Sequence, residues 1–325
     1  MRSASIKMRE KPSSKVFYWL IFLFFALISL LIIWMLVWGF VTSLKSPDDF
    51  NMNNNVLGFP SLDPNDPNNS LGAFLHWDNY QNILQHFVFE KKTFFYSGSK
   101  LIGHQTTANI GLMFYNTILY AGVGGFIYAM VPAIVAYLCA KFDYRFSHIV
   151  FVTFTLMLCI PIVGSYPTEI TFLRNTGMYD TFWGNWLQKT GGEGMYFFVY
   201  YAFFKSQSNV YREAAEIDGA SETHIMWRIY MPMAIKIIGT VFLIQFVSLW
   251  NDFQTPELYL PTHPTLAYGV YELTLVSSNA GDLATLNNVP CRMAACMVLA
   301  LPITVIFIIF KNRLMGDITL GGIKE

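Results

Sequence analysis

Long apolar runs alternate with polar segments along this chain of 325 residues. The first run, residues 16–43, contains no charged residue, and a helix of that length rises about 42 Å, more than the roughly 30 Å of a bilayer's hydrocarbon core. A signal peptide would have a shorter apolar region and a small-residue cleavage site, so we interpret this run as a retained membrane span. Later apolar runs predict five further spans, at Met113–Ala140, His148–Thr168, a segment ending near Lys205, Tyr230–Phe253 and Pro290–Phe310.

The fourth of these spans is the weakest. Its apolar core, Met195–Phe204, rises only about 15 Å as a helix, so a crossing helix has to begin earlier and include polar residues of the stretch WLQKTGGEG. Such backbone is tolerated at membrane depth only where protein or a water-filled cavity shields it from lipid. This predicts Glu193 at the outer mouth of a cavity, where it would accept hydrogen bonds from sugar hydroxyls or pair with Arg174. The alternative is a solvated loop followed by a short, tilted span.

The composition agrees with a membrane protein. Hydrophobic residues make up 54% of the chain and charged residues 13%, against about 25% charged residues in soluble domains. The formal net charge is zero, so the chain lacks the basic field of nucleic-acid-binding proteins. We therefore predict an all-α fold, a polytopic membrane protein with six transmembrane helices. Four cysteines lie in or beside apolar runs without metal-site spacing, and we interpret them as buried thiols: Cys139, Cys159, Cys291 and Cys296.

Lysine and arginine residues determine the predicted orientation. Most of them fall in segments that share one side of the membrane with the N-terminus, while acidic residues prevail in the other segments. By the positive-inside rule both termini are cytoplasmic. The chain is then divided into a cytoplasmic N-terminus (1–15), the first span (16–43), an extracytoplasmic segment (44–111), a membrane core (112–313) with a cytoplasmic loop (205–231), and a cytoplasmic tail (314–325).

Two stretches of the extracytoplasmic segment have recognisable sequence patterns. The stretch DDFNMNNNVLGFPSLDPNDPNNS is rich in Asn, Asp and Pro, which is typical of a flexible loop. The sequence FLHWDNYQNILQHF after it has the spacing of a short amphipathic helix. We expect most of the Asn-rich stretch to be a flexible loop.

Motifs for several chemistries are missing from the sequence. It has no phosphate-binding G-x-x-x-x-G-K-[ST] loop, no H-E-x-x-H and no G-x-S-x-G. The predicted spans are also nearly free of the ionisable side chains that ion- and proton-driven carriers place near the membrane midplane. We predict no catalytic residue, no metal site and no bound cofactor, so the protein either works passively or takes its energy from a partner.

A short stretch before the fifth span, YREAAEIDGASETHIMWRIYMPMA, is the most informative part of the chain. Arg212–Asp218 suits a short helix, Gly219 can adopt the left-handed conformation that ends it, and Ser221 can begin a second helix. Pro232 suits the first turn of the span that follows. On spacing alone, an ordinary amphipathic connector is an alternative.

These residues also resemble a known motif. Glu213-Ala214-Ala215, then Gly219, Ile229 and Pro232, are similar to E-A-A-x3-G-x9-I-x-L-P, the EAA motif of permease subunits of binding-protein-dependent ABC importers, with Met231 in place of Leu. Residues 250–271 resemble the region that closes span five in maltose-type carbohydrate permeases. Residues 315–325 resemble their glycine-rich tail. The resemblance points to the MalG-like branch and implies the type I ABC importer permease fold.

The resemblance implies a role for the motif and a set of partners. The EAA loop would dock into a groove of a cytoplasmic ATPase, with Glu213 making a charged contact, Ala214 and Ala215 fitting the groove, and Asp218 and Gly219 forming the turn. Two copies of that ATPase would bind ATP and Mg²⁺, and this chain neither. The remaining implied partners are a second permease subunit and an extracellular solute-binding protein, reached by the outer loop Arg174–Lys189. The location implied is a bacterial plasma membrane.

A sugar pathway needs aromatic faces and side-chain amides. The spans offer the following candidates, to which Glu193 is added: Asn116, Tyr196, Tyr200, Gln245, Trp250 and Asn251. Each aromatic residue could equally pack in the protein or face lipid. Gln245 is expected to face inward, because an amide in lipid is costly. Two functions outside this class stay open: a passive carrier or channel, and a membrane-embedded assembly subunit without ATP coupling.

Overall fold

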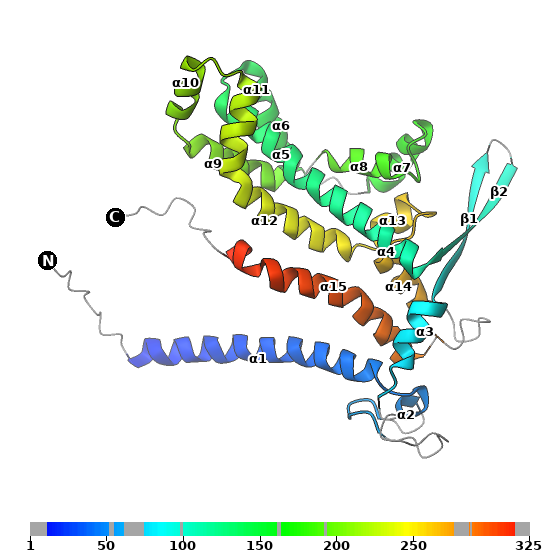
Figure 1. Cartoon of the computed structure of the whole chain (residues 1–325). Helices are drawn as coiled ribbons and strands as arrows, with labels where there is room; N and C mark the ends of the chain where they lie inside the picture. The colour runs from blue at the N-terminus through cyan, green and yellow to red at the C-terminus, as the bar shows by residue number, and fades with distance from the viewer. Residues whose placement is uncertain are drawn as a thin grey trace. The chain divides into compact units, whose positions relative to one another are not determined.

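The structure, a computed structural model, describes residues 12–51, 55–61, 75–97, 100–160, 164–191, 194–275, 286 and 288–315 (Figure 1). In chain order the elements are α1 (Pro12–Ser43), α2 (Pro47–Asn51), α3 (Asp78–His86), β1 (Val88–Ser97), β2 (Lys100–Asn109), α4 (Ile110–Ile118), the π-helical turn η1 (Leu119–Val123), α5 (Gly124–Lys141), α6 (Arg145–Cys159), α7 (Tyr166–Asn175), α8 (Phe182–Lys189), α9 (Gly194–Ser206), α10 (Val210–Ile217), α11 (Glu222–Ile225), the π-helical turn η2 (Met226–Tyr230), α12 (Met231–Trp250), α13 (Gln254–Tyr259), α14 (Leu266–Leu275) and α15 (Val289–Met315). The chain forms two compact units, Met1–Ile83 with Gly281–Met297, and Leu84–Ala280 with Val298–Glu325.

Four helical runs in the described part of the chain are long and apolar enough to cross a membrane. They are Lys15–Ser43, Ile110–Lys141, Glu222–Trp250 and Val289–Phe310. The second joins α4, η1 and α5, and the third joins α11, η2 and α12. These runs agree with the first, second, fifth and sixth predicted spans.

The third and fourth predicted spans differ from the structure. The continuous helix expected over His148–Thr168 is wrong, because α6 ends at Cys159 and α7 begins separately at Tyr166. Gly164 has a φ of 80°, which no helix accommodates, and a proline lies in the first turn of α7. α6 and α9 rise only about 22 Å and 20 Å, so neither reaches the length of a spanning helix by itself.

The fifth span also begins earlier than expected. Pro232 lies in the first turn of α12, but α12 continues from η2 without a break, so the helical run starts at Glu222. A proline within a helix removes one backbone hydrogen bond. The π-helical turn immediately before Pro232 changes the hydrogen-bond pattern at that point, as π-turns commonly do inside α-helices.

The all-α prediction is wrong for residues 88–109, where β1 and β2 form an antiparallel hairpin paired from Val88↔Asn109 to Ser97↔Lys100. The base of this hairpin packs on α14. The rings of Phe89 and Tyr268 lie 5.0 Å apart, and the Lys91 ammonium forms ion pairs with Glu257 (3.2 Å) and Glu272. The sheet is therefore fixed to the segment that follows α12.

The smaller unit contains a folded turn directly after α1, where a flexible loop was expected. The Asn79 amide donates to the carbonyl oxygens of Ser43 (2.9 Å) and Lys45 (2.8 Å). The Lys45 side chain is fully buried, and its ammonium donates to the Asn55 carbonyl at 2.6 Å. A buried charge is stable only when it has such partners. The described residues between 42 and 61 therefore have a defined conformation.

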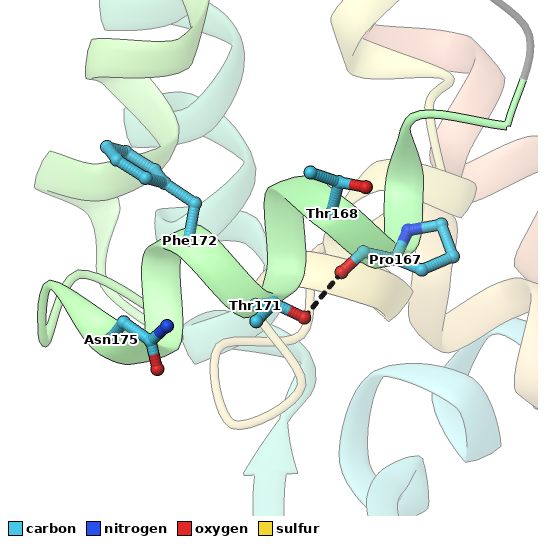
Figure 2. A pocket seen from close by; sticks show the side chains of 5 residues that line it. All are labelled: Pro167, Thr168, Thr171, Phe172 and Asn175. Carbon is cyan, nitrogen blue, oxygen red and sulfur yellow. Dashed lines mark hydrogen bonds between the residues drawn. The ribbon is translucent and has the colours of Figure 1, made fainter.

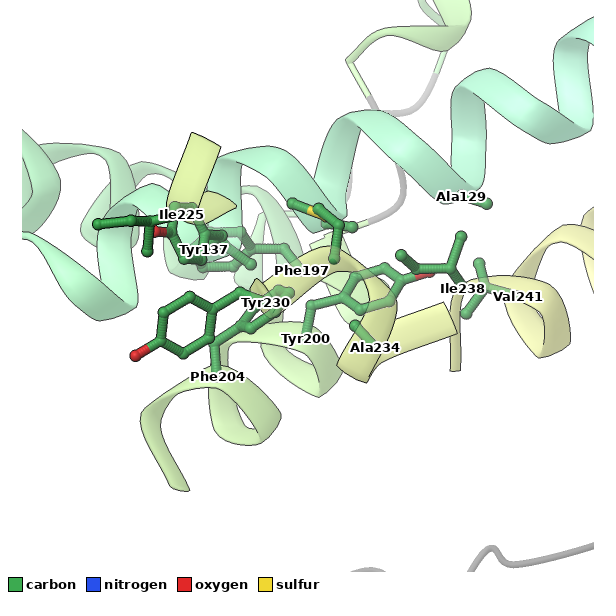
Figure 3. Close-up of a cluster of buried hydrophobic side chains, with 13 residues drawn as sticks. Ala129, Tyr137, Phe197, Tyr200, Phe204, Ile225, Tyr230, Ala234, Ile238 and Val241 are labelled. Carbon is green, nitrogen blue, oxygen red and sulfur yellow. The ribbon is translucent and has the colours of Figure 1, made fainter. Parts of the chain in front are cut away.

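In the larger unit, α5, α9 and α12 share one hydrophobic core (Figure 3). Alanines along α5 keep its inner face narrow, and the large rings of Tyr137, Phe204 and Tyr230 fill the space between the helices. The Tyr137 ring lies 5.5 Å from that of Phe204 and 5.2 Å from that of Tyr230. This core supports α10 and α11 at one end of α5 and α12, while α13, α14 and the hairpin lie toward the other end (Figure 1).

Candidate functional site

The helix–turn–helix at residues 210–225 forms as the sequence predicts. α10 ends at Ile217, and Gly219 has a φ of 77°, in the left-handed region. The amides of Gly219 and the next residue donate to carbonyl oxygens in the last turn of α10 at 3.0 and 2.9 Å, which closes the helix. The Ser221 hydroxyl then accepts a hydrogen bond from the His224 amide and caps α11.

Arg212 holds the two short helices together. Its Nε donates to Glu216 on the same helix at 2.7 Å, and its Nη2 donates to Glu222 on α11. Its Nη1 donates to the carbonyl oxygen of Lys141, the last residue of α5, at 3.1 Å. The guanidinium carbon also lies 4.6 Å from the centroid of the Phe142 ring. One side chain thus links both arms of the turn to the end of a long helix.

Lys141 provides a second link at the same place. Its ammonium donates to the carbonyl of Gln207 at 2.6 Å and to the side chain of Asn209 at 3.0 Å. It also lies 4.8 Å from the centroid of the Tyr230 ring, whose hydroxyl donates to the Ser208 carbonyl. The end of α5 and the last residue of η2, next to α12, therefore both contact residues 207–209, which connect α9 to α10.

The outer face of α10 is exposed and partly apolar. Ile217 is 86% exposed, and Val210 and Tyr211 are also largely exposed. Glu213 and Ala214 lie on this surface. Apolar side chains gathered at the exposed end of a bundle are typical of a surface that another protein covers.

The motif residues divide between this exposed face and the core. Glu213, Ala214, Asp218, Gly219 and Pro232 are exposed. Ala215 and Ile229 are half-buried and pack against the core of the larger unit. Sequence reasoning missed Arg212 and Ile217, although an arginine one position before the motif and an isoleucine two positions after its alanines are visible in the sequence.

The loop Arg174–Lys189, expected to face a binding protein, lies at the opposite end of the larger unit. Asp180 fastens it to the segment after α13, because its carboxylate accepts hydrogen bonds from the amide and hydroxyl of Thr262 at 3.1 and 2.7 Å. Trp183 on α8 is 78% exposed. A shallow pocket runs along the neighbouring α7 (Figure 2), lined by Pro167, Thr168, Thr171, Phe172 and Asn175. The surface combines aromatic and polar side chains.

Four of the six described pathway candidates are buried and pack within the chain. The Asn116 amide donates to the Pro264 carbonyl at 3.0 Å, and the Trp250 indole donates to the Leu299 carbonyl at 3.0 Å. Tyr200 and Gln245 are also buried, at 0% and 4% exposure. The expectation that Gln245 faces inward agrees with this burial.

The other candidates do not complete a common cavity. Tyr196 is half-buried, and Asn251 is exposed, its amide donating to the Val247 carbonyl one turn earlier. Tyr200 belongs to the core shared by α5, α9 and α12, whereas Trp250 belongs to a separate cluster with Tyr120. Glu193 lies outside the described residues. No group of three or more His, Cys, Asp or Glu side chains within the described ranges is placed to hold a metal ion.

Comparisons with known proteins agree with this arrangement. Residues 110–316 match the family described as binding-protein-dependent transport system inner membrane component. The diacetylchitobiose uptake system permease protein NgcG of Streptomyces coelicolor is 25% identical over 227 residues, covering 67% of this chain and 72% of the relative. The melibiose/raffinose/stachyose import permease protein MelC of Bacillus subtilis is 24% identical over 67% of this chain and 77% of its own length. The maltose/maltodextrin transport system permease protein MalG of Vibrio vulnificus is 23% identical over 65% and 71%.

The fold has a counterpart among solved structures. A chain in the crystal structure of a bacterial ABC transporter involved in the import of the acidic polysaccharide alginate superposes with a TM-score of 0.70. The match covers 94% of this chain and 99% of that chain at 18% sequence identity, which shows a shared fold. Since the family match covers most of the chain, from the second long helix to the end of the last, this protein belongs to the family of binding-protein-dependent transport system inner membrane components.

Proposed function

We propose that this chain is the permease subunit of an ATP-driven importer and forms half of a translocation pathway for a sugar or oligosaccharide. The observation that carries this is the α10–α11 turn. It bears an EAA-like motif, presents Ile217 on an exposed apolar face, and is tied through Arg212 and Lys141 to the ends of the long helices. A surface built in this way can receive a partner's movement and pass it to the membrane helices.

The proposed assembly follows from the family. An extracellular binding protein delivers the solute, a second permease completes the pathway as a heterodimer, and two copies of a cytoplasmic ATPase bind ATP and Mg²⁺. Both termini and the α10–α11 turn lie in the cytoplasm, in a chain that crosses the plasma membrane six times. Because α6 and α9 are short, their crossings depend on neighbouring residues and on the partner permease.

The proposed mechanism is a biased two-state equilibrium. Closure of the ATPase pair on ATP moves α10 and α11, with Glu213 in charged contact, and favours one of two arrangements of the membrane helices. The solute then meets the exposed or half-exposed pathway residues Asn251 and Tyr196. The buried candidates hold the helices in place.

The sugar class rests on the relatives, whose names refer to diacetylchitobiose, melibiose and maltose. A purification tests the assembly and its cargo together. Affinity-tagged chain extracted from its native membrane should bring down an ABC ATPase and a second EAA-bearing permease, and its binding protein should carry a carbohydrate by mass spectrometry. A chain that purifies alone and moves sugar without nucleotide would indicate the passive carrier, and a chain that moves no solute with its partners would indicate an assembly subunit.

A further inference from the structure

The last residue of the outer loop Arg174–Lys189 is a buried lysine. Lys189, the last residue of α8, is 4% exposed. Its side-chain carbons pack against α5 at Gly124, where a Cβ would come within 3.0 Å of them. A side chain at position 124 would require the Lys189 side chain or Leu249 to shift.

The ammonium of Lys189 reaches a carboxylate through a tyrosine hydroxyl. Its Nζ lies 3.3 Å from the hydroxyl of Tyr120, which donates to the Asp252 carboxylate at 2.7 Å. The same ammonium lies 4.5 Å and 5.5 Å from the ring centroids of Tyr120 and Tyr128. Asp252 also accepts a hydrogen bond from the Thr255 amide at the start of α13. Three segments meet here: α8, the π-helical turn in the second long helix, and the end of α12.

Burying Lys189 in this contact costs free energy. Burial lowers the pKa of Lys189 to about 8, although the charge of Asp252 acts in the opposite direction. The buried face of α8 carries two more polar groups, since the side-chain amide of Asn185 and the indole N–H of Trp186 are buried and have no hydrogen-bond partner within the described residues. Buried polar groups without full partners destabilise the closed arrangement, so α8 is held by an interaction that can be released.

The contact of Lys189 with Tyr120 and Asp252 connects the outer loop to the helical run that begins at the α10–α11 turn. Asp252 follows directly after α12, which is continuous with α11 through Glu222–Trp250. α8 lies in the loop Arg174–Lys189. A shift of α8 therefore changes the restraint on a helical run that begins at the exposed α10–α11 turn.

We propose that Lys189, Tyr120 and Asp252 form a latch that holds α8 on the outer end of α12 and is released when a solute-binding protein docks on the outer loop. The three residues act as positioning residues. The latch rests on the proposed function, because its release requires a solute-binding protein that docks on the outer loop.

Chemical labelling of the unmodified complex tests release directly. An amine-acetylating reagent, followed by mass spectrometry, reports the exposure of Lys189 in the reconstituted importer. Labelling should be slow at rest and rise at least about fivefold when binding protein and ATP are added, whereas exposed Lys92 on β1 should react equally in both states. Lys189 that stays unreactive while the complex turns over ATP would overturn the latch.

Conservative variants provide a second test of the latch. Tyr120→Phe removes the bridging hydroxyl but keeps the ring, and should raise ATPase activity without binding protein by about tenfold, the factor expected for one hydrogen bond to a charged group. Asp252→Asn should have a similar effect, and the double variant should add little, because both remove one interaction. Tyr115→Phe, on the exposed side of α4, is the matched control.

The outcomes separate the two proposals. Unchanged basal ATPase activity in an intact Tyr120→Phe complex would show a static contact and refute the latch alone. Absence of any stimulation by binding protein in the wild-type complex would refute the proposed function, and the latch with it.

Discussion

Gly219 occupies a left-handed position whose surroundings are open. A Cβ there would meet no atom within 4 Å, so Gly219→Ala costs only backbone strain, on the order of 1 kcal/mol. We expect normal membrane insertion but several-fold slower ATP-driven uptake, with Gly219→Val more severe because its side chain is β-branched. Gly219→Asn, which tolerates this conformation better, should retain most of the activity. Uptake at wild-type rates in both the Ala and Val variants would show that the turn geometry is unimportant.

Arg212 is the residue on which the shape of the α10–α11 turn depends most. Arg212→Gln removes its two carboxylate contacts and the link to the Lys141 carbonyl. We expect limited proteolysis between residues 205 and 222 to become several times faster in the purified protein. The control is Arg228→Gln, because Arg228 is exposed on η2. Equal cleavage rates in the two variants would contradict the role of Arg212 in holding α10 and α11 together.

Because Lys189 is buried, we expect the free energy of unfolding to depend on pH. Its pKa in the folded chain is about 8, below the ordinary 10.5, so between these values the unfolded chain binds more protons than the folded chain. Stability therefore rises with pH from about 8 to 10.5, by up to about 3 kcal/mol, and this gain is lost as the pH falls through 8. The melting temperature of the detergent-solubilised protein should increase over this window, and Lys189→Met should flatten the increase. A wild-type curve as flat as that of the variant would contradict the buried charge.

Residues in the turn could be predicted from sequence because their roles are local. Gly219 and Ser221 act on backbone within three or four positions, and spacing captures that. The contact of Arg212 with Lys141 and the contact of Lys189 with Tyr120 could not be predicted, because these partners on α5 and η1 lie far away in the chain. The same applies to Asn116 and Trp250, whose amide and indole groups serve internal packing.

The hairpin β1–β2 is the element whose attachment can be tested most simply. Lys91→Met leaves Glu257 and Glu272 without their shared cation, while the neighbouring Lys92 is exposed. We expect Lys91→Met to lower the melting temperature by a few degrees and to speed proteolysis within residues 88–109, with Lys92→Met unaffected. The same melting curve for both variants would show that the ion pairs contribute nothing to the attachment.

Elements were predictable where one physical signal dominated. Uninterrupted apolar length identified the four long helical runs. The break between α6 and α7 was not anticipated, although a glycine with positive φ and a proline mark it. The hairpin was missed because residues 88–109 carry no long apolar run, and its contact with α14 through Phe89 and Tyr268 joins residues far apart in the chain.

At the scale of the whole molecule, the charge distribution predicts the topology. Reporter fusions after Lys141 and after Leu314 should read as cytoplasmic, and a fusion at Asn65 as extracytoplasmic. These positions lie on either side of the long helical runs, and the reading at Leu314 tests whether α6 and α9 together contribute an even number of crossings. An extracytoplasmic reading at Leu314 would mean that the chain crosses an odd number of times.

In the proposed function, ATP hydrolysis by a partner drives sugar import through the α10–α11 turn. Its most direct test is uptake of the sugar carried by the binding protein into proteoliposomes that contain the purified complex and enclosed ATP. We expect accumulation above the external concentration with wild-type chain, and loss of uptake with Glu213→Lys while the complex stays assembled. Equilibration of the sugar without ATP, or wild-type accumulation with Glu213→Lys, would contradict this account.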